Sequence, residues 1–177
     1  MNLSECSSPA VIGEILKVWP NIAKTAALTM IQKYGPPDEA CSGRLVWHNN
    51  GPWRRTVVYA EEVEHNFPTP HHDVLEQYIP YRVPVGKFDQ LAAFDGSVLV
   101  DRTKGEISAR CEGEGGNLLA LNLANDIVHG RKDVATARKE YGEAMKAKQR
   151  GNPPEIMQRL MFEVGKCETG EPDVTII

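Results

Sequence analysis

Two β-hairpin patterns lie in the middle of this chain, with helical patterns on either side of them. The first spans about residues 44–63, where strand-favouring segments flank an Asn-Gly turn at Asn50 and Gly51. The second spans about residues 97–111, where apolar and polar residues alternate on both sides of a turn. Because strands that are neighbours in sequence pair antiparallel, we expect an α+β fold. In this fold, N-terminal and C-terminal helices pack on an antiparallel sheet.

The helical patterns have recognisable starts and ends. Ser8 before Pro9 is typical of a helix start, and a second apolar stripe of helical period runs from Pro20 to Gly35. In the C-terminal third, three further helices are predicted: from a cap at Asn117 to His129, from a cap at Asp133 to Gly151, and around Ile156–Met161.

The segment between the hairpins is rich in proline and histidine. Residues His65–Asp73 read His-Asn-Phe-Pro-Thr-Pro-His-His-Asp, and the two prolines favour an extended loop. Asp73 followed three residues later by Glu76 is typical of a helix start, so a short helix is predicted up to Ile79.

The length of 177 residues fits a single domain over 1–177, with residues 165–177 expected to form a mobile tail. No basic start or apolar stretch indicates a secretory signal, and no segment is apolar enough to cross a membrane. We therefore expect a soluble, cytoplasmic protein without a membrane partner. Its four cysteines are expected to be reduced thiols: Cys6, Cys41, Cys111 and Cys167.

The net charge of −4 argues against a large phosphate-binding surface, so nucleic acid is not an expected partner. The segment Arg131–Arg150 is a local exception, because basic residues outnumber acidic ones there. We interpret it as the solvated face of a helix. The alternative is a weak nucleic-acid contact through the same residues.

The histidines are candidate metal ligands. Imidazole and carboxylate groups bind zinc and related divalent ions. His65, His71, His72 and His48 are the predicted ligands, although their spacing matches no established metal motif. His71 and His72 are neighbours and point to opposite sides of an extended chain, so only one of them is expected to join the others. The competing interpretation is an ordered loop with hydrogen-bonded histidines.

The first hairpin offers a second candidate site. Trp47, Trp53, Arg54 and Arg55 surround its turn and could bind an anionic ligand, a peptide or a base. Alternatively, the two tryptophans pair across the hairpin into the core, and the two arginines lie in solvent.

Three further features are better explained by a structural role than by a catalytic or binding role. Cys111 falls on the apolar side of a predicted strand, so a buried thiol is favoured over a nucleophile. The glycine-rich segment 112–117 lacks the lysine of a phosphate-binding loop and carries two glutamates. Asn122 and Asp126 share a very apolar helix, where they are expected to hold a neighbouring loop or, with Arg110, to line a cleft.

Three functions are consistent with these features. The leading hypothesis is a non-catalytic module that binds a protein or a small molecule through the sheet and the His65–Asp73 loop. The second is a metal-dependent hydrolase, in which the histidines hold a divalent ion such as zinc and Glu64 or Glu76 acts as the base. The third is a weak nucleic-acid association through Arg131–Arg150.

Overall fold

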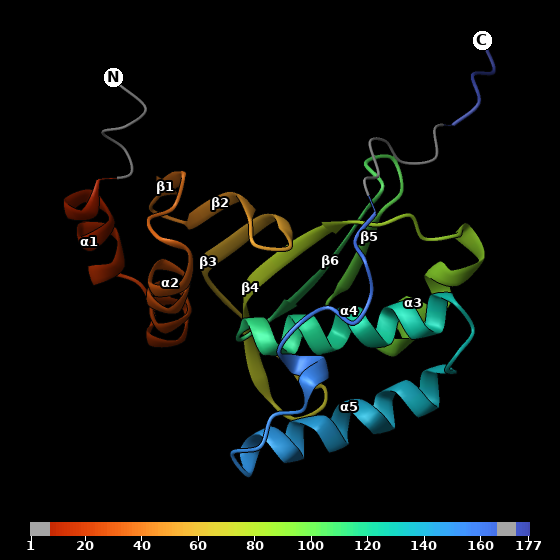
Figure 1. The fold of residues 1–177 in the computed structure, drawn as a ribbon. Helices are drawn as coiled ribbons and strands as arrows, with labels where there is room; N and C mark the ends of the chain where they lie inside the picture. Colours follow the sequence, from red (N-terminus) through yellow and green to blue (C-terminus); the bar gives the residue numbers. More distant parts are fainter. Residues whose placement is uncertain (1–7, 166–172) are drawn as a thin grey trace.

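The computed structural model describes residues 8–165 and 173–177, so part of the predicted tail and Cys6 and Cys167 lie outside the described residues. Six strands form one antiparallel sheet in the order β1-β2-β3-β4-β6-β5 (Figure 1). The predicted α+β fold is confirmed. The strands are β1 (Glu39–Cys41), β2 (Arg44–Asn50), β3 (Trp53–His65), β4 (His71–Pro80), β5 (Val98–Asp101) and β6 (Glu106–Cys111).

Five helices accompany the sheet. None of the described helices is long and apolar enough to cross a bilayer. As predicted, Ser8 caps the first helix and Asp133 caps the last. The helices are α1 (Pro9–Lys17), α2 (Asn21–Tyr34), α3 (Phe88–Phe94), α4 (Glu114–Val128) and α5 (Val134–Gln149), with short 3-10 turns η2 (Val85–Lys87) and η3 (Glu155–Met157).

Strand β4 replaces the helix that the sequence predicted over 73–79, so that prediction is wrong. The strand pairs with β3 on one side and with β6 on the other, which places it inside the sheet. Asp73 and Glu76 resemble a helix start, yet both are buried and bonded to other strands or loops. Pairing on both edges therefore outweighs the local signal.

Two C-terminal predictions also need correction. Helix α4 begins at Glu114 after Gly113, and Asn117 is a buried residue within the helix. Its side-chain amide donates to the carbonyl oxygen of Leu75 and to Gln77 Oε1, so it ties the helix to β4. The helix expected around Ile156 is only the 3-10 turn η3.

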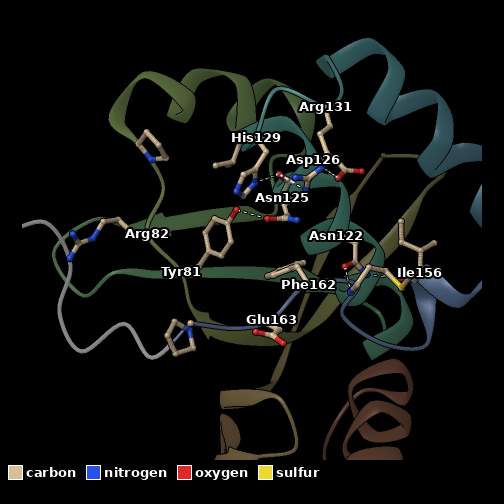
Figure 2. Close-up of a pocket in the computed structure, with 15 residues that line it drawn as sticks. Tyr81, Arg82, Asn122, Asn125, Asp126, His129, Arg131, Ile156, Phe162 and Glu163 are labelled. Atoms are coloured by element: carbon tan, nitrogen blue, oxygen red, sulfur yellow. Dashed lines mark hydrogen bonds and ion pairs between the residues drawn. The ribbon is translucent and has the colours of Figure 1, made fainter.

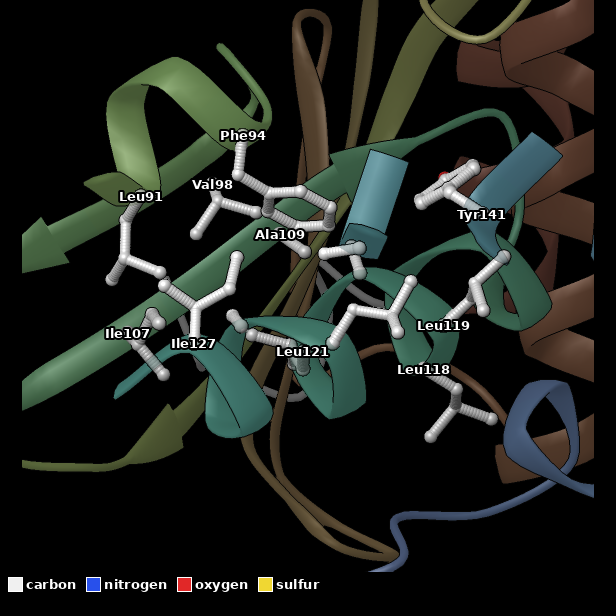
Figure 3. Close-up of a cluster of buried hydrophobic side chains, with 14 of the residues drawn as sticks. Leu91, Phe94, Val98, Ile107, Ala109, Leu118, Leu119, Leu121, Ile127 and Tyr141 are labelled. Carbon is white, nitrogen blue, oxygen red and sulfur yellow. The ribbon is translucent and has the colours of Figure 1, made fainter. Parts of the chain in front are cut away.

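All five helices pack on the same face of the sheet. One core cluster joins α1 and α2 to Leu45 and Leu75, and the other joins α3, α4 and α5 to Ile79 and Ile107. Leu75 and Ile79 are four residues apart in β4, so their side chains point to one side. Figure 3 shows the second cluster, in which Ile127 of α4 lies next to Ile107 and Leu121 belongs to the same cluster.

The buried carboxylate of Glu114 joins the two groups of helices. It accepts hydrogen bonds from Tyr34 Oη (2.6 Å), Trp53 Nε1 (2.7 Å) and Gln77 Nε2 (3.0 Å), and it is paired with Lys33. Burial alone would raise the pKa of Glu114, but these donors outweigh it and lower the pKa. One side chain thus links α2, β3, β4 and α4.

We expect the Glu114→Gln variant to be less stable at neutral pH by about 2 kcal/mol, because charge-assisted hydrogen bonds weaken. A carboxyl group whose pKa is lowered by folding adds stability above its ordinary pKa near 4.5, and this stability is lost as the pH falls through the lower folded value. The difference between wild type and variant should therefore shrink below pH 4.5. Urea unfolding at several pH values measures it.

Glu112→Gln is the matched control, because it removes the same charge from an exposed carboxylate two residues away. Its free energy of unfolding should stay within about 0.5 kcal/mol of wild type. A Glu114→Gln variant that unfolds like this control at every pH would contradict the central role of the carboxylate.

A second prediction concerns the contact between α4 and β6. A Cβ atom on Gly116 would overlap with Cys111 Sγ and lie 3.0 Å from its Cβ. We expect Gly116→Ala to destabilise the fold by about 1–3 kcal/mol in urea unfolding, because crowding outweighs the better helix propensity of alanine. Gly142→Ala in α5 has open space and should instead stabilise by about 0.5–1 kcal/mol. Equal stabilisation of both variants would disprove the close packing.

Candidate metal centre

Two of the predicted ligands meet where β3 ends and β4 begins. His65 and His71 are directly paired across the two strands, so their side chains lie on the same side of the sheet. Their ring centroids are 5.0 Å apart. Asp73 follows His71 by two residues and therefore points to that same side. The strand pairing thus assembles three side chains that the sequence spreads over nine positions.

Asp73 lies between the two imidazoles. Its Oδ1 atom is 3.2 Å from His71 Nε2, and its Oδ2 atom is 3.3 Å from His65 Nδ1. Ser97 Oγ donates a hydrogen bond to Oδ2 from the connection between α3 and β5. In the same connection, Asp95 Oδ1 lies 3.7 Å from His65 Nε2. Three segments of the chain therefore converge on one polar cluster.

The cluster is nearly closed to solvent. The side chain of Asp73 is 1% exposed, and those of His71 and His65 are 12% and 18% exposed. Phe67 lies next to the cluster, and the centroids of its ring and the Tyr141 ring are 4.9 Å apart. The Arg138 guanidinium stacks on the Phe67 ring at 3.8 Å from its centroid. Burial strengthens every electrostatic interaction within the cluster.

The electrostatics reflect this closeness. Hydrogen bonds to Asp73 and to Cys111 raise the pKa of His71 to about 11. Burial would raise the pKa of Asp73, but hydrogen bonds from His71 and Ser97 outweigh it and lower the pKa. Burial raises the pKa of Asp95. A positive charge on the His71 imidazole is therefore strongly stabilised by Asp73.

The donor atoms also suit a metal ion. One donor atom each from His65, His71 and Asp73 lies within 4.8 Å of the others. Tetrahedral zinc with bonds of about 2.0–2.2 Å needs donors roughly 3.3–3.6 Å apart, so small side-chain movements would close the site. Asp73 Oδ1 is buried and faces His71 Nε2 at 3.2 Å without meeting hydrogen-bond geometry, so a cation between the two atoms would replace this contact.

Cys111 reaches the edge of the cluster. Its Sγ atom lies 3.6 Å from His71 Nε2, the nitrogen that also faces Asp73. His71 Nδ1 is bonded to the carbonyl oxygen of Thr69. A catalytic Cys-His-Asp triad needs the thiol and the carboxylate on different ring nitrogens. The arrangement therefore favours a buried structural thiol, as the sequence suggested.

The other two predicted ligands lie elsewhere. His72 is paired with Glu64 and points to the opposite side of the sheet. His48 lies on β2, where its Nε2 atom is 2.6 Å from Glu39 Oε1 and its side chain is 44% exposed. The structure thus brings together two of the four predicted histidines and separates the remaining two.

The hairpin site is divided between core and surface. Trp47 and Trp53 are both 2% exposed and belong to different core clusters. Their indole N–H groups donate to the carbonyl oxygen of Gly35 and to Glu114. Arg54 and Arg55 both pair with Glu106, and Arg55 also stacks on Tyr78. These four residues do not form one exposed surface.

The basic segment 131–150 is extensively paired. Arg131 and Lys132 bind Asp126, Lys132 also binds Glu140, and Lys146 binds Glu143. The Arg138 guanidinium donates to the carbonyl oxygen of Phe94. Much of its positive charge is therefore used within the protein.

The sequence predicted a helix cap at Asp73 and no site role for Asp95 or Ser97. The alternation of His71, Asp73 and Leu75 could have shown that Asp73 shares a strand face with His71. Nothing local to Asp95 or Ser97 indicates that they reach the histidines, because α3 lies between β4 and this segment.

Comparison with known proteins adds no assignment. No protein-family model, curated protein or solved structure matches this chain.

Proposed function

We propose that this chain is a non-catalytic binding protein whose cluster of His65, His71 and Asp73 holds one divalent transition-metal ion, with zinc as the first candidate. Two imidazoles and one carboxylate form a donor set that suits zinc and related ions better than it suits calcium or magnesium. The observation that carries the proposal is the close approach of these three donors in a nearly closed part of the fold.

The surroundings support binding of a cation. Asp73 is already ionised, and Asp95 adds a second carboxylate close to His65. Ser97 donates to Asp73, so it would orient the carboxylate as residues around metal sites commonly do. His71 Nδ1 is bonded to the carbonyl oxygen of Thr69, which leaves Nε2 to face the ion.

A hydrolytic role has less support. It would need a general base beside the ion and an open path for the substrate. Glu64 and Glu76 were the expected bases, but both lie an odd number of residues from their neighbouring ligand and point to the other side of the sheet. Glu76 is also engaged by Tyr59 and Ser108. Binding without turnover is therefore the better match.

A bound ion would fasten the β3–β4 connection to the sheet. Its ligands come from the end of β3 and the start of β4, and Ser97 extends the contact to the α3–β5 connection. Because a metal that binds only the folded state stabilises it, the midpoint of thermal unfolding should rise with metal concentration.

We expect the metal-stripped wild type to bind close to one equivalent of Zn²⁺ or Co²⁺ in a calorimetric titration. His65→Ala, His71→Ala and Asp73→Asn should each weaken binding by about 100-fold or more, because a three-ligand site loses one donor. Saturating Zn²⁺ should raise the thermal midpoint of wild type but leave that of these variants nearly unchanged.

His72→Ala and His48→Ala are the matched controls, since each removes an imidazole that lies outside the cluster. Both should bind Zn²⁺ like wild type. A wild type that binds no metal, or a His72→Ala variant that loses as much affinity as His71→Ala, would overturn the proposal. Circular dichroism of each variant shows whether the fold is kept.

A further inference from the structure

A large pocket lies at the opposite end of β4 from the candidate metal centre. Its volume is about 1010 Å³, which is enough for a small organic ligand. Figure 2 shows its walls, which come from the segment after β4, the C-terminal half of α4, the α4–α5 turn and the segment after η3. Asn122 and Asp126 line it, whereas Arg110, once expected beside them, does not.

The orientation of one amide sets the chemistry of the pocket. Tyr81 Oη donates a hydrogen bond of 2.7 Å to Asn125 Oδ1, drawn as a dashed line in Figure 2. Because the oxygen accepts this bond, the Nδ2 group keeps both N–H donors, and neither has an acceptor among the described residues. Asn125 is only 7% exposed, so its unused donors are held in a fixed place within the pocket wall.

Two other polar groups of the wall are already engaged within the protein. Asn122 uses its amide to hold the backbone at Ile156, Arg159 and Met161. Arg131 binds Asp126, which also pairs with Lys132. Asp126 and the two cations that it binds therefore largely neutralise one another.

The apolar wall is aromatic. The rings of Tyr81 and Phe162 meet edge to face, with centroids 5.7 Å apart. Both side chains are partly buried and line the pocket together with Met161. A flat apolar group placed here would gain from both burial and ring contacts. Tyr81 connects the two features, because its ring is part of the aromatic wall and its hydroxyl group orients the Asn125 amide.

We propose that this pocket binds a small planar molecule that carries a carbonyl acceptor, the simplest case being an aromatic amide. The aromatic body packs on Tyr81 and Phe162, and its carbonyl oxygen accepts from Asn125 Nδ2. A ligand without such an acceptor, for example a simple amine, would leave the Asn125 donors unused. Ligands of this class bind without any covalent step.

This site is independent of the candidate metal centre. Strand β4 begins at His71 in the metal centre and ends at Pro80 in the pocket wall, and its 10 residues span about 30 Å in an extended strand. No residue is shared by the two sites. The pocket can therefore bind its ligand whether or not the metal proposal holds.

Binding can be tested on the full chain with benzamide as the probe and benzylamine as a cationic probe of similar size. We expect benzamide to bind with a dissociation constant on the order of 1 mM, as is usual for so small a ligand. Saturation-transfer NMR detects it, and the side-chain amide signals of Asn125 should shift. Benzylamine should bind at least 10-fold more weakly.

Asn125→Asp keeps the acceptor for Tyr81 Oη but removes both donors, so it should weaken benzamide binding by about 10-fold. Tyr81→Phe keeps the ring and releases the amide, and it should weaken binding several-fold. Asn152→Asp, an exposed asparagine outside the pocket, is the control with the same charge change and should bind like wild type.

The inference is overturned by any of three results: wild type that does not bind benzamide, benzylamine that binds equally well, or a folded Asn125→Asp variant with unchanged affinity. Thermal unfolding of each variant verifies the fold before binding is measured. The result with Tyr81→Phe keeps the test informative if Asn125→Asp does not fold.

Discussion

The carboxylate of Glu114 is the interaction on which the arrangement of the helices depends. It stands at the start of α4, 10% exposed, and collects donors from α2, β3 and β4. A buried charge without such partners is strongly unfavourable, so the group specifies where its neighbours must lie as well as holding them. With α2 and α4 fixed on the same side, the helices above the two core clusters form one continuous layer. The sheet face beneath that layer carries the histidine cluster and Gln77. Glu114 and Asn117 of α4 hold the Gln77 side chain in place.

The parts of the fold that could be predicted from sequence are those with local causes. The Asn-Gly turn, the caps at Ser8 and Asp133 and the alternating strands of the second hairpin are all signals contained within a few residues. Strand β4 was missed because its polar residues acquire partners from distant segments. Asp73 meets Ser97, Glu76 meets Ser108, and Gln77 meets Glu114. In isolation the same residues resemble a solvent-exposed helix.

The candidate metal centre also contains residues that the sequence predicted and residues that only the tertiary structure reveals. His65 and His71 were identified because imidazole side chains are uncommon and their chemistry is specific. Asp73, Asp95 and Ser97 joined them only through the pairing of β3 with β4 and the return of the chain after α3. The tryptophans of the first hairpin show the opposite case. A surface site and burial in the core were both expected alternatives for them, and the structure shows both buried. Their N–H groups donate to the carbonyl oxygen of Gly35 and to Glu114.

The sheet ends in two short edge strands, β1 with three residues and β5 with four. An edge strand presents unpaired backbone groups on which another chain can add a strand, and a short edge offers few of them. The long strands β3 and β4 lie in the interior of the sheet, where β2 pairs with Trp53–Tyr59 of β3 and β6 pairs with Leu75–Pro80 of β4. Over these paired segments another chain could add a strand only after the fold opens, so strand order limits where this protein could join fibrillar β structure.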